Sequence, residues 1–152
     1  TGHLVLSTIH TNDAPGVLTR LTDMGISQYF VADALIGVIS QRLVKRLCPA
    51  CKRKGKTNAV EMKMLKLTEP VTICRPKGCQ FCNGTGYRGR TAVHEIMYLD
   101  ESIRDALATD ISAEQLREAV RQSGMTTIWE NCREYVLRGV TSVQELMALS
   151  ME

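Results

Sequence analysis

The sequence contains few aromatic residues and no long hydrophobic run. Phenylalanine, tryptophan and tyrosine make up 5% of the 152 residues, which argues against a surface on which the bases of single-stranded nucleic acid would stack. No apolar run approaches the length of a membrane-spanning helix. Hydrophobic residues still amount to 44%, so the chain can bury a core, and we expect one ordinary domain or two small ones.

Motifs for phosphate binding and for covalent catalysis are also lacking. No G-x-x-x-x-G-K-[ST] loop occurs, and no G-x-G-x-x-G segment opens a helix after a strand. No set of serine, histidine and aspartate has a supporting context. On these residues alone, the chain has no loop that would cradle a nucleotide phosphate.

Four of the six cysteines form two C-x-x-C pairs, Cys48 with Cys51 and Cys79 with Cys82. A C-x-x-C turn directs two thiolates to one point, and two such turns supply the four soft ligands of a tetrahedral zinc site. Glycine-containing turn residues follow each pair. Since four protein ligands leave no open coordination position, we predict a structural zinc ion.

Other interpretations of the cysteines are a thioredoxin-type redox pair, disulfides or unrelated buried thiols. Disulfides require an oxidising compartment, and the sequence shows no signal-peptide pattern. Cys74 and Cys132 lie in apolar stretches, and we predict that they are free thiols used for packing. Because Cys74 is only five residues from Cys79, it is an alternative zinc ligand.

Charge is distributed unevenly along the chain. Residues 1–90 carry 14 lysine and arginine residues and five acids, whereas residues 91–152 carry five and 11. Seven cations and no acid lie between residues 42 and 56. This run is either a solvated face that compensates the charge of a four-thiolate zinc site or a face that meets an anion. Halves of opposite charge can also dock on each other, within a chain or between copies.

The first residues are predicted to form a strand followed by two helices. Residues 3–9 are an apolar run typical of a strand buried on both faces. Asp13 as N-cap and Pro15 in the first turn predict a helix that a glycine ends. Residues 27–47 have helical spacing. His10 falls at the carboxyl end of the predicted strand, where open α/β sheets bind ligands, so it is a candidate to contact a phosphate.

The middle of the chain is predicted to be a zinc unit that depends on its metal. We expect a short helix at residues 58–67, a strand at 71–74, a turn at 87–90 and a strand at 91–98. The whole unit has too few large apolar residues for a core of its own. The two arginines of its turn are either solvated or available to a phosphate, an adenine face or a carboxylate.

The remaining residues are predicted to form short amphipathic helices. One spans residues 100–108, and a capping box from Ser112 to Gln115 opens the next. A third helix follows residues 126 and 127, and a second capping box from Ser142 to Glu145 opens the last. Short links between such helices predict a small helical subdomain.

Four segments occur in an order that is specific to one family: TGHLVLSTIHTNDA at 1–14, QRLVKRLCPAC at 41–51, CQFCNGTGYRGRT at 79–91 and GVTSVQEL at 139–146. The first resembles the histidine box of the secretion ATPase superfamily. The second and third resemble the two halves of a tetracysteine zinc element, and the fourth resembles a closing helix. This combination is similar to the type II secretion ATPases and the type IV pilus extension ATPases. Pilus retraction motors share the histidine box but generally lack the cysteine element.

The resemblance implies an α/β fold, the C-terminal part of a RecA-like P-loop ATPase core. Residues 1–47 would belong to that core, residues 48–98 to an inserted tetracysteine zinc element, and residues 99–152 to a C-terminal helical subdomain. The full-length protein would be a cytoplasmic homo-hexamer at the inner face of the cell membrane, with no transmembrane segment and no nucleic acid partner. It would dock on an inner-membrane platform protein and use ATP and Mg²⁺ to power assembly of a type IV pilus or a secretion pseudopilus.

The resemblance also implies roles for single residues. His10 resembles the box histidine near the γ-phosphate and is the catalytic candidate, while Gln41, Arg42 and Arg90 lie in stretches near the family's nucleotide pocket. Cys48, Cys51, Cys79 and Cys82 resemble the zinc ligands. In that family the P-loop precedes the segment matched here, so we expect the 152-residue chain alone not to hydrolyse ATP.

Two alternatives come from other classes of protein. One is a free-standing zinc adaptor, because residues 79–86 also resemble one repeat of the zinc region of heat-shock chaperones that bind unfolded chains. The other is a nucleic-acid zinc ribbon, which the basic run favours and the acidic second half opposes.

Overall fold

The computed structural model describes residues 2–109 and 111–150, and it is a mixed α/β structure of two compact units. The first unit comprises Thr1–Ser40 with Glu95–Thr126, and the second comprises Gln41–His94 with Thr127–Glu152. The three-segment division predicted from the sequence stays a prediction.

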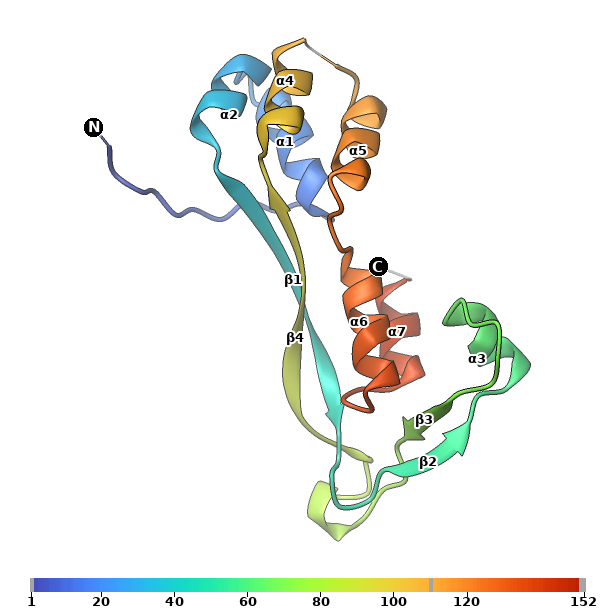
Figure 1. Cartoon of the computed structure of the whole chain (residues 1–152). Helices are drawn as coiled ribbons and strands as arrows, with labels where there is room; N and C mark the ends of the chain where they lie inside the picture. Colours follow the sequence, from blue (N-terminus) through green and yellow to red (C-terminus); the bar gives the residue numbers. More distant parts are fainter. Residues whose placement is uncertain (1, 110, 151–152) are drawn as a thin grey trace. The chain divides into compact units, whose positions relative to one another are not determined.

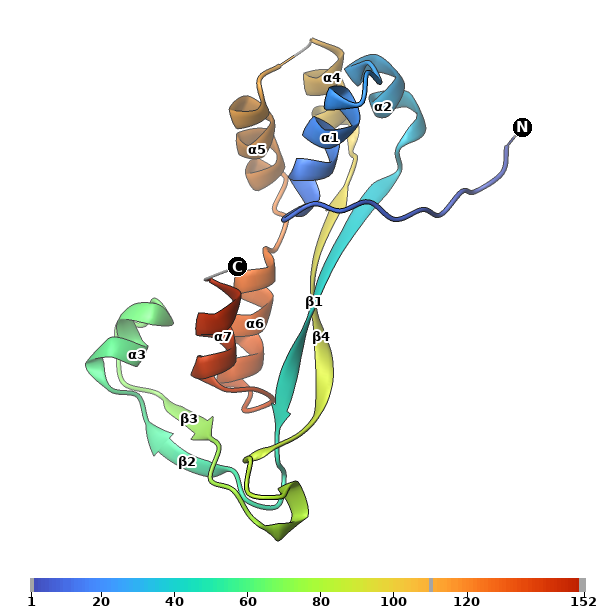
Figure 2. The same ribbon diagram turned by 180° about the vertical axis from the view of Figure 1, so that it is seen from behind.

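The helices and strands are labelled in Figures 1 and 2. In chain order they are α1 (Ala14–Asp23), α2 (Gln28–Ala34), β1 (Gly37–Leu47), β2 (Arg53–Lys56), α3 (Ala59–Met64), β3 (Thr72–Arg75), the 3₁₀ helix η1 (Gln80–Cys82), β4 (Tyr87–Tyr98), α4 (Glu101–Ala108), α5 (Ala113–Gln122), α6 (Ile128–Leu137) and α7 (Val143–Leu149). Strand β1 pairs with β4, and β2 pairs antiparallel with β3. None of the helices in the described ranges is long and apolar enough to cross a membrane.

The first unit is built on helices α1, α2, α4 and α5. Its core includes Leu18, Met97, Ile103 and Leu116, all nearly inaccessible to solvent. Arg104 joins two of the helices, because its guanidinium donates hydrogen bonds to the backbone oxygens of residues 32 and 35 at the end of α2. These bonds satisfy carbonyls that a helix leaves without partners at its C-terminus.

The second unit places α6 and α7 against β3 and the central part of β1 and β4. Its core includes Val44, Ile73, Val136 and Leu146, and Leu65 after α3 joins it. Residues between the cysteine pairs therefore share a core with the last two helices, which is consistent with the prediction that they have no core of their own. Trp129 packs at the edge of this core, with Lys66 Nζ 4.7 Å from its ring centroid.

The predicted strand at residues 3–9 is wrong, because the described residues 2–12 form neither helix nor strand. Leu4, Val5 and Leu6 are 72–88% exposed. An apolar run becomes a buried strand only when neighbouring strands satisfy its backbone groups. No strand in the described part of the chain pairs with this run.

The predicted helix at 27–47 is also wrong beyond Ala34, because α2 ends there and β1 begins at Gly37. Exposure alternates along β1 with a period of two, as expected for a strand. The close pairing with β4 explains why residue 37 is a glycine, because a Cβ at this position would lie 2.9 Å from the carbonyl oxygen of Met97. The predicted turn at 87–90 is likewise part of a strand, the start of β4.

The other helix predictions are confirmed within a few residues, and their N-caps explain why. Asp13 accepts the N–H of Gly16 at the start of α1, and Ser112 forms the predicted capping box with Gln115 on α5. The box predicted for α7 is wrong. Ser142 makes no cap bond and instead lies 2.7 Å from the hydroxyl of Tyr87, while Glu145 accepts the N–H of Lys45 on β1.

Candidate metal centre

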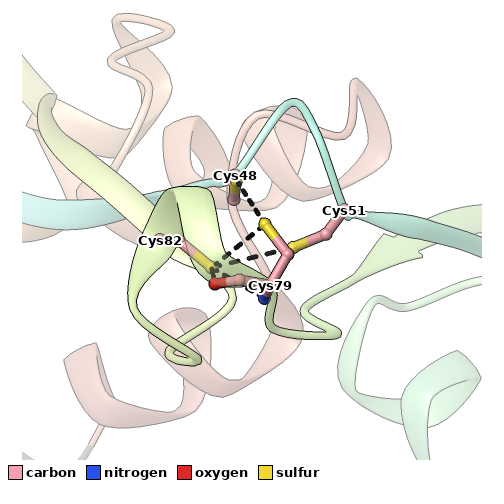
Figure 3. Close-up of side chains that lie close together, drawn as sticks. All are labelled: Cys48, Cys51, Cys79 and Cys82. Carbon is pink, nitrogen blue, oxygen red and sulfur yellow. Dashed lines mark hydrogen bonds between the residues drawn. The ribbon is translucent and has the colours of Figure 1, made fainter.

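The four cysteines of the two C-x-x-C pairs converge on one point in the second unit (Figure 3). All four Sγ atoms lie within 4.8 Å of one another. Cys48 and Cys79 are 4.0 Å apart, and Cys82 lies 3.8 Å from both Cys51 and Cys79. A tetrahedron with zinc–sulfur bonds of about 2.3 Å has sulfur–sulfur edges of about 3.8 Å. These three sulfur–sulfur separations therefore match the edges of a four-thiolate zinc site.

Two short turns carry the ligands. Cys48 follows the last residue of β1, and its N–H donates to the carbonyl of Gly86 beyond the second pair. Cys51 precedes β2, whereas Cys79 directly precedes η1 and Cys82 is its last residue. Gly86 has a φ of +79°, and a Cβ there would lie 2.5 Å from Pro76. The glycine is therefore required both by backbone conformation and by space.

Backbone N–H groups favour the ionised form of Cys82. Its Sγ accepts the N–H of Cys79 at 3.3 Å and that of Gly86 at 3.2 Å. Burial opposes ionisation, but these donors outweigh it and lower the pKa of Cys82 to about 6. Burial instead raises the pKa of Cys51 to about 11. Since zinc binds thiolates, these two N–H donors prepare Cys82 for the metal.

Burial makes the centre a closed one. Cys48, Cys51 and Cys82 are at most 9% exposed, and Cys79 is half-buried. Four protein ligands complete a tetrahedral shell, so the metal would hold the two turns together and would not carry out chemistry. The cluster of soft, buried sulfur donors fits zinc well.

The remaining two thiols lie outside this cluster, as the packing interpretation predicted. Cys74 on β3 is buried against Gly139, and its Sγ would be 2.8 Å from a Cβ at that position. Cys132 on α6 belongs to the core of the second unit, where burial raises its pKa to about 12. Both are free cysteines with the environment of apolar side chains.

One cation next to the cluster was not predicted to have a role of its own. Lys52, directly after Cys51, donates from Nζ to the carbonyl of Gly139 at 2.8 Å. This bond connects the first cysteine turn to the loop between α6 and α7. The only sequence signal for it was the place of Lys52 inside the basic run at residues 42–56.

A comparison of the sequence with protein families decides the wider relationship. The model of the family described as "Type II/IV secretion system protein" matches residues 1–148. The chain belongs to this family. The resemblance seen in the sequence is thus confirmed over nearly the whole chain.

Several curated members of the type II/IV secretion system family are similar to the chain over its full length. It is 41% identical over 156 residues to "Type IV pilus assembly ATPase PilB" of Thermus thermophilus and 41% identical over 154 residues to "Type II secretion system protein E" of Pseudomonas aeruginosa. It is 38% identical over 154 residues to "Type II secretion system ATPase E" of Vibrio cholerae. The chain spans 18% of the first relative and 30% of the other two.

The structure places the candidate nucleotide contacts in both units. His10 is exposed and lies four residues before α1 in the first unit. In the second unit, Gln41 and Arg42 lie on β1 and Arg90 lies on β4. Gln41 and Arg90 are exposed, whereas Arg42 is half-buried, with Nη1 3.2 Å from the carbonyl of Gln41.

Proposed function

We propose that the chain is the C-terminal part of a hexameric cytoplasmic ATPase that powers assembly of a type IV pilus or a type II secretion pseudopilus. In this proposal residues 1–47 complete a RecA-like core, residues 48–98 form the zinc element, and residues 99–152 form the helical subdomain. ATP and Mg²⁺ bind the whole protein, which docks on a platform protein at the inner face of the membrane. Family membership over residues 1–148, together with the tetracysteine cluster, carries the proposal.

The surroundings of His10 support a contact made by its side chain. The start of α1 is a place where anions often bind, but the N–H groups of residues 14 and 16 already donate to Glu95 and Asp13. A phosphate near this segment would therefore meet the imidazole of His10 rather than those two amides. A neutral imidazole can donate one hydrogen bond to a γ-phosphate oxygen and so report its loss on hydrolysis.

The candidate nucleotide residues offer different kinds of contact. Arg42 and Arg90 offer guanidinium groups, which suit phosphate oxygens because they donate in a planar fork. Gln41, which directly precedes Arg42 on β1, offers a side-chain amide. The zinc ion supplies no reaction step, because its four thiolates leave no position for substrate. Its contribution is to hold the turns that follow β1 and precede β4.

ATP hydrolysis by the protein that contains this chain tests the proposal. We expect His10→Ala to lower kcat at least about tenfold, with a smaller change in KM, because the imidazole acts on the γ-phosphate. The matched control is His3→Ala, an exposed histidine on the same segment, which should leave kcat unchanged. We also expect the 152-residue chain by itself to show no turnover. Turnover by the chain alone, or equal effects of the two histidine variants, would contradict the proposal.

A further inference from the structure

The second unit has a surface pocket of about 400 Å³ whose walls come from both cysteine turns. Pro49 lies between the first two cysteines, and Phe81 lies between the second two. Leu47 at the end of β1 and Gly139 and Val140, from the link between α6 and α7, complete the apolar part of the lining. The metal centre therefore fixes two of the segments that form this pocket.

The pocket is strongly basic. Four of its nine lining residues are cations, namely Arg46, Lys52, Arg88 and Arg138, and none of the nine is acidic. One of them stacks on an exposed aromatic ring: the guanidinium of Arg88 lies 3.6 Å from the ring centroid of Phe81, which is 56% exposed. Arginine and aromatic side chains on one surface are the combination that protein interfaces favour at their centres.

The backbone of the pocket is not arranged to bind a compact phosphate. Such sites use several backbone N–H groups that point at one anion. Here the N–H groups of Leu47, Lys52, Gly139 and Val140 all donate to backbone carbonyls. Recognition is therefore left to the side-chain cations and to the apolar walls. That combination suits carboxylates spaced along a chain, with apolar side chains between them.

We propose that this pocket docks an extended segment of a partner protein in which acidic residues alternate with large apolar ones. The carboxylates pair with the four cations, and the apolar side chains rest on Phe81, Pro49 and Val140. The charge of the whole unit favours such a partner, since it holds 15 lysine and arginine residues and six acids. A net charge of this sign also speeds the encounter with an acidic chain.

The proposal gives the metal a purpose that hydrolysis of ATP does not require. Without the metal, the turns that carry Pro49 and Phe81 lose their common anchor, so the pocket loses its shape. Docking should then be lost together with zinc, whether or not the protein hydrolyses ATP.

The test uses fluorescence anisotropy with the zinc-loaded protein and a labelled short peptide of alternating glutamate and leucine, at an ionic strength of about 0.15 M. We expect saturable binding that Arg138→Glu weakens at least about tenfold, because it reverses a charge inside the pocket. The matched control is Lys54→Glu, which makes the same charge change on exposed β2, outside the pocket. It should weaken binding less than about threefold. Equal weakening by both variants would overturn the proposal in favour of diffuse attraction.

Two further experiments test whether apolar contacts contribute to binding and which class of ligand the pocket accepts. Phe81→Ser removes the exposed ring and should weaken binding of the glutamate–leucine peptide at least about fivefold. A glutamate–serine peptide should bind weakly to the wild type and to every variant. Chelation of the metal should abolish binding. Zinc content measured on each variant shows that the fold is intact. The proposal fails if the peptide does not bind, if the glutamate–serine peptide binds equally well, or if pyrophosphate or anionic vesicles displace the peptide from the pocket.

Discussion

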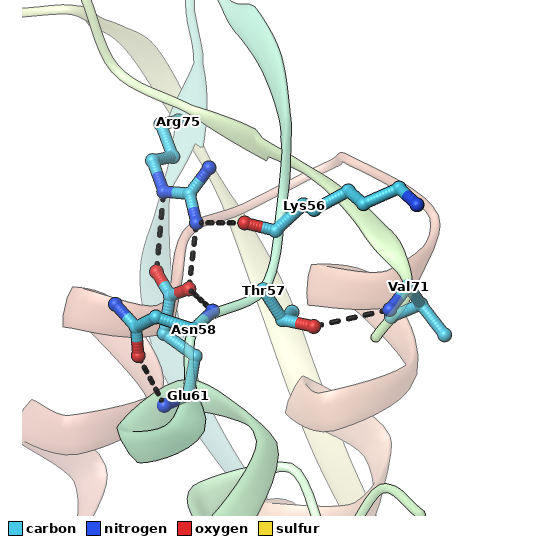
Figure 4. A network of polar contacts seen from close by, with 6 residues as sticks. All are labelled: Lys56, Thr57, Asn58, Glu61, Val71 and Arg75. Atoms are coloured by element: carbon cyan, nitrogen blue, oxygen red, sulfur yellow. Dashed lines mark hydrogen bonds and ion pairs between the residues drawn. The ribbon is translucent and has the colours of Figure 1, made fainter. Parts of the chain in front are cut away.

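Arg75 holds Glu61 through both carboxylate oxygens, with Nε 3.1 Å from Oε1 and Nη2 2.6 Å from Oε2 (Figure 4). The same guanidinium donates to the carbonyl of Lys56, and Glu61 also accepts the N–H of Asn58 at 2.8 Å. One ion pair thus connects the end of β2, the start of α3 and the end of β3. A bidentate pair of this kind fixes geometry as well as charge.

Replacing Glu61 by glutamine should lower the free energy of unfolding by about 1–3 kcal/mol, because Arg75 would lose a charged, half-buried partner. Urea denaturation of the zinc-loaded protein measures the change. The control is Glu69→Gln, which removes the same charge from an exposed residue. If the two variants are equally stable, the ion pair contributes nothing beyond surface charge.

The same pair predicts how stability depends on pH. Burial opposes ionisation of Glu61, but the guanidinium of Arg75 and the N–H of Asn58 outweigh it and hold its pKa below the ordinary value of 4.5. A carboxylate with a lowered folded pKa stabilises fully above its unfolded pKa and stops doing so as pH falls through the folded pKa. The stability difference between wild type and Glu61→Gln should therefore be constant near neutral pH and shrink below about pH 4.5. A difference that grew on acidification would contradict this assignment.

Gly139 is predicted to tolerate no side chain. Its φ is +67°, and a Cβ would lie 2.8 Å from Sγ of buried Cys74. Gly139→Ala should therefore lower the free energy of unfolding by about 2–4 kcal/mol, the sum of backbone strain and overpacking. Gly124→Ala is the control, because Gly124 has a φ of +82° with no atom within 4 Å of the added Cβ. Gly124→Ala should lower the free energy of unfolding by only about 1 kcal/mol. Equal losses for the two variants would show that the lack of space beside Cys74 does not add to the cost.

The helix caps and the metal ligands were predictable because they depend on neighbours in the sequence. Asp13 and Ser112 are N-caps whose partners lie three residues away, so the pattern alone locates them. The two C-x-x-C pairs likewise contain their own turn geometry, and their 27-residue separation does not disturb it. The signal for each of these features is local.

The errors came where distant pairing overrides local pattern. Residues 37–47 have apolar spacing that fits a helix, yet β1 forms because β4, some 50 residues later, pairs with it. Ser142 and Glu145 read as a capping box, yet both are engaged by residues of β4 and β1. The pocket cations were visible as a basic run only up to residue 56. Arg88 and Arg138 lie outside that run, and the fold brings them to the same pocket.

Glu95 is predicted to fix the start of α1. This buried residue on β4 accepts the N–H of Ala14 at 2.6 Å, although the two are 81 residues apart. Glu95→Ala should speed hydrogen exchange of the Ala14 amide and lower the free energy of unfolding by about 1–3 kcal/mol, since a buried donor loses its acceptor. Glu95→Gln keeps an acceptor oxygen and should lose less. If alanine and glutamine behave alike, the hydrogen bond does not hold the helix.

Metal content is the most direct test of the central claim that the four clustered cysteines hold a structural zinc ion. Mass spectrometry of the purified protein should find one zinc per chain, and Cys82→Ser should lose most of it and destabilise the protein. Cys74→Ser, which changes a thiol outside the cluster, should keep one zinc per chain. Absence of zinc from the wild type, or its loss from Cys74→Ser but not from Cys82→Ser, would contradict the assignment.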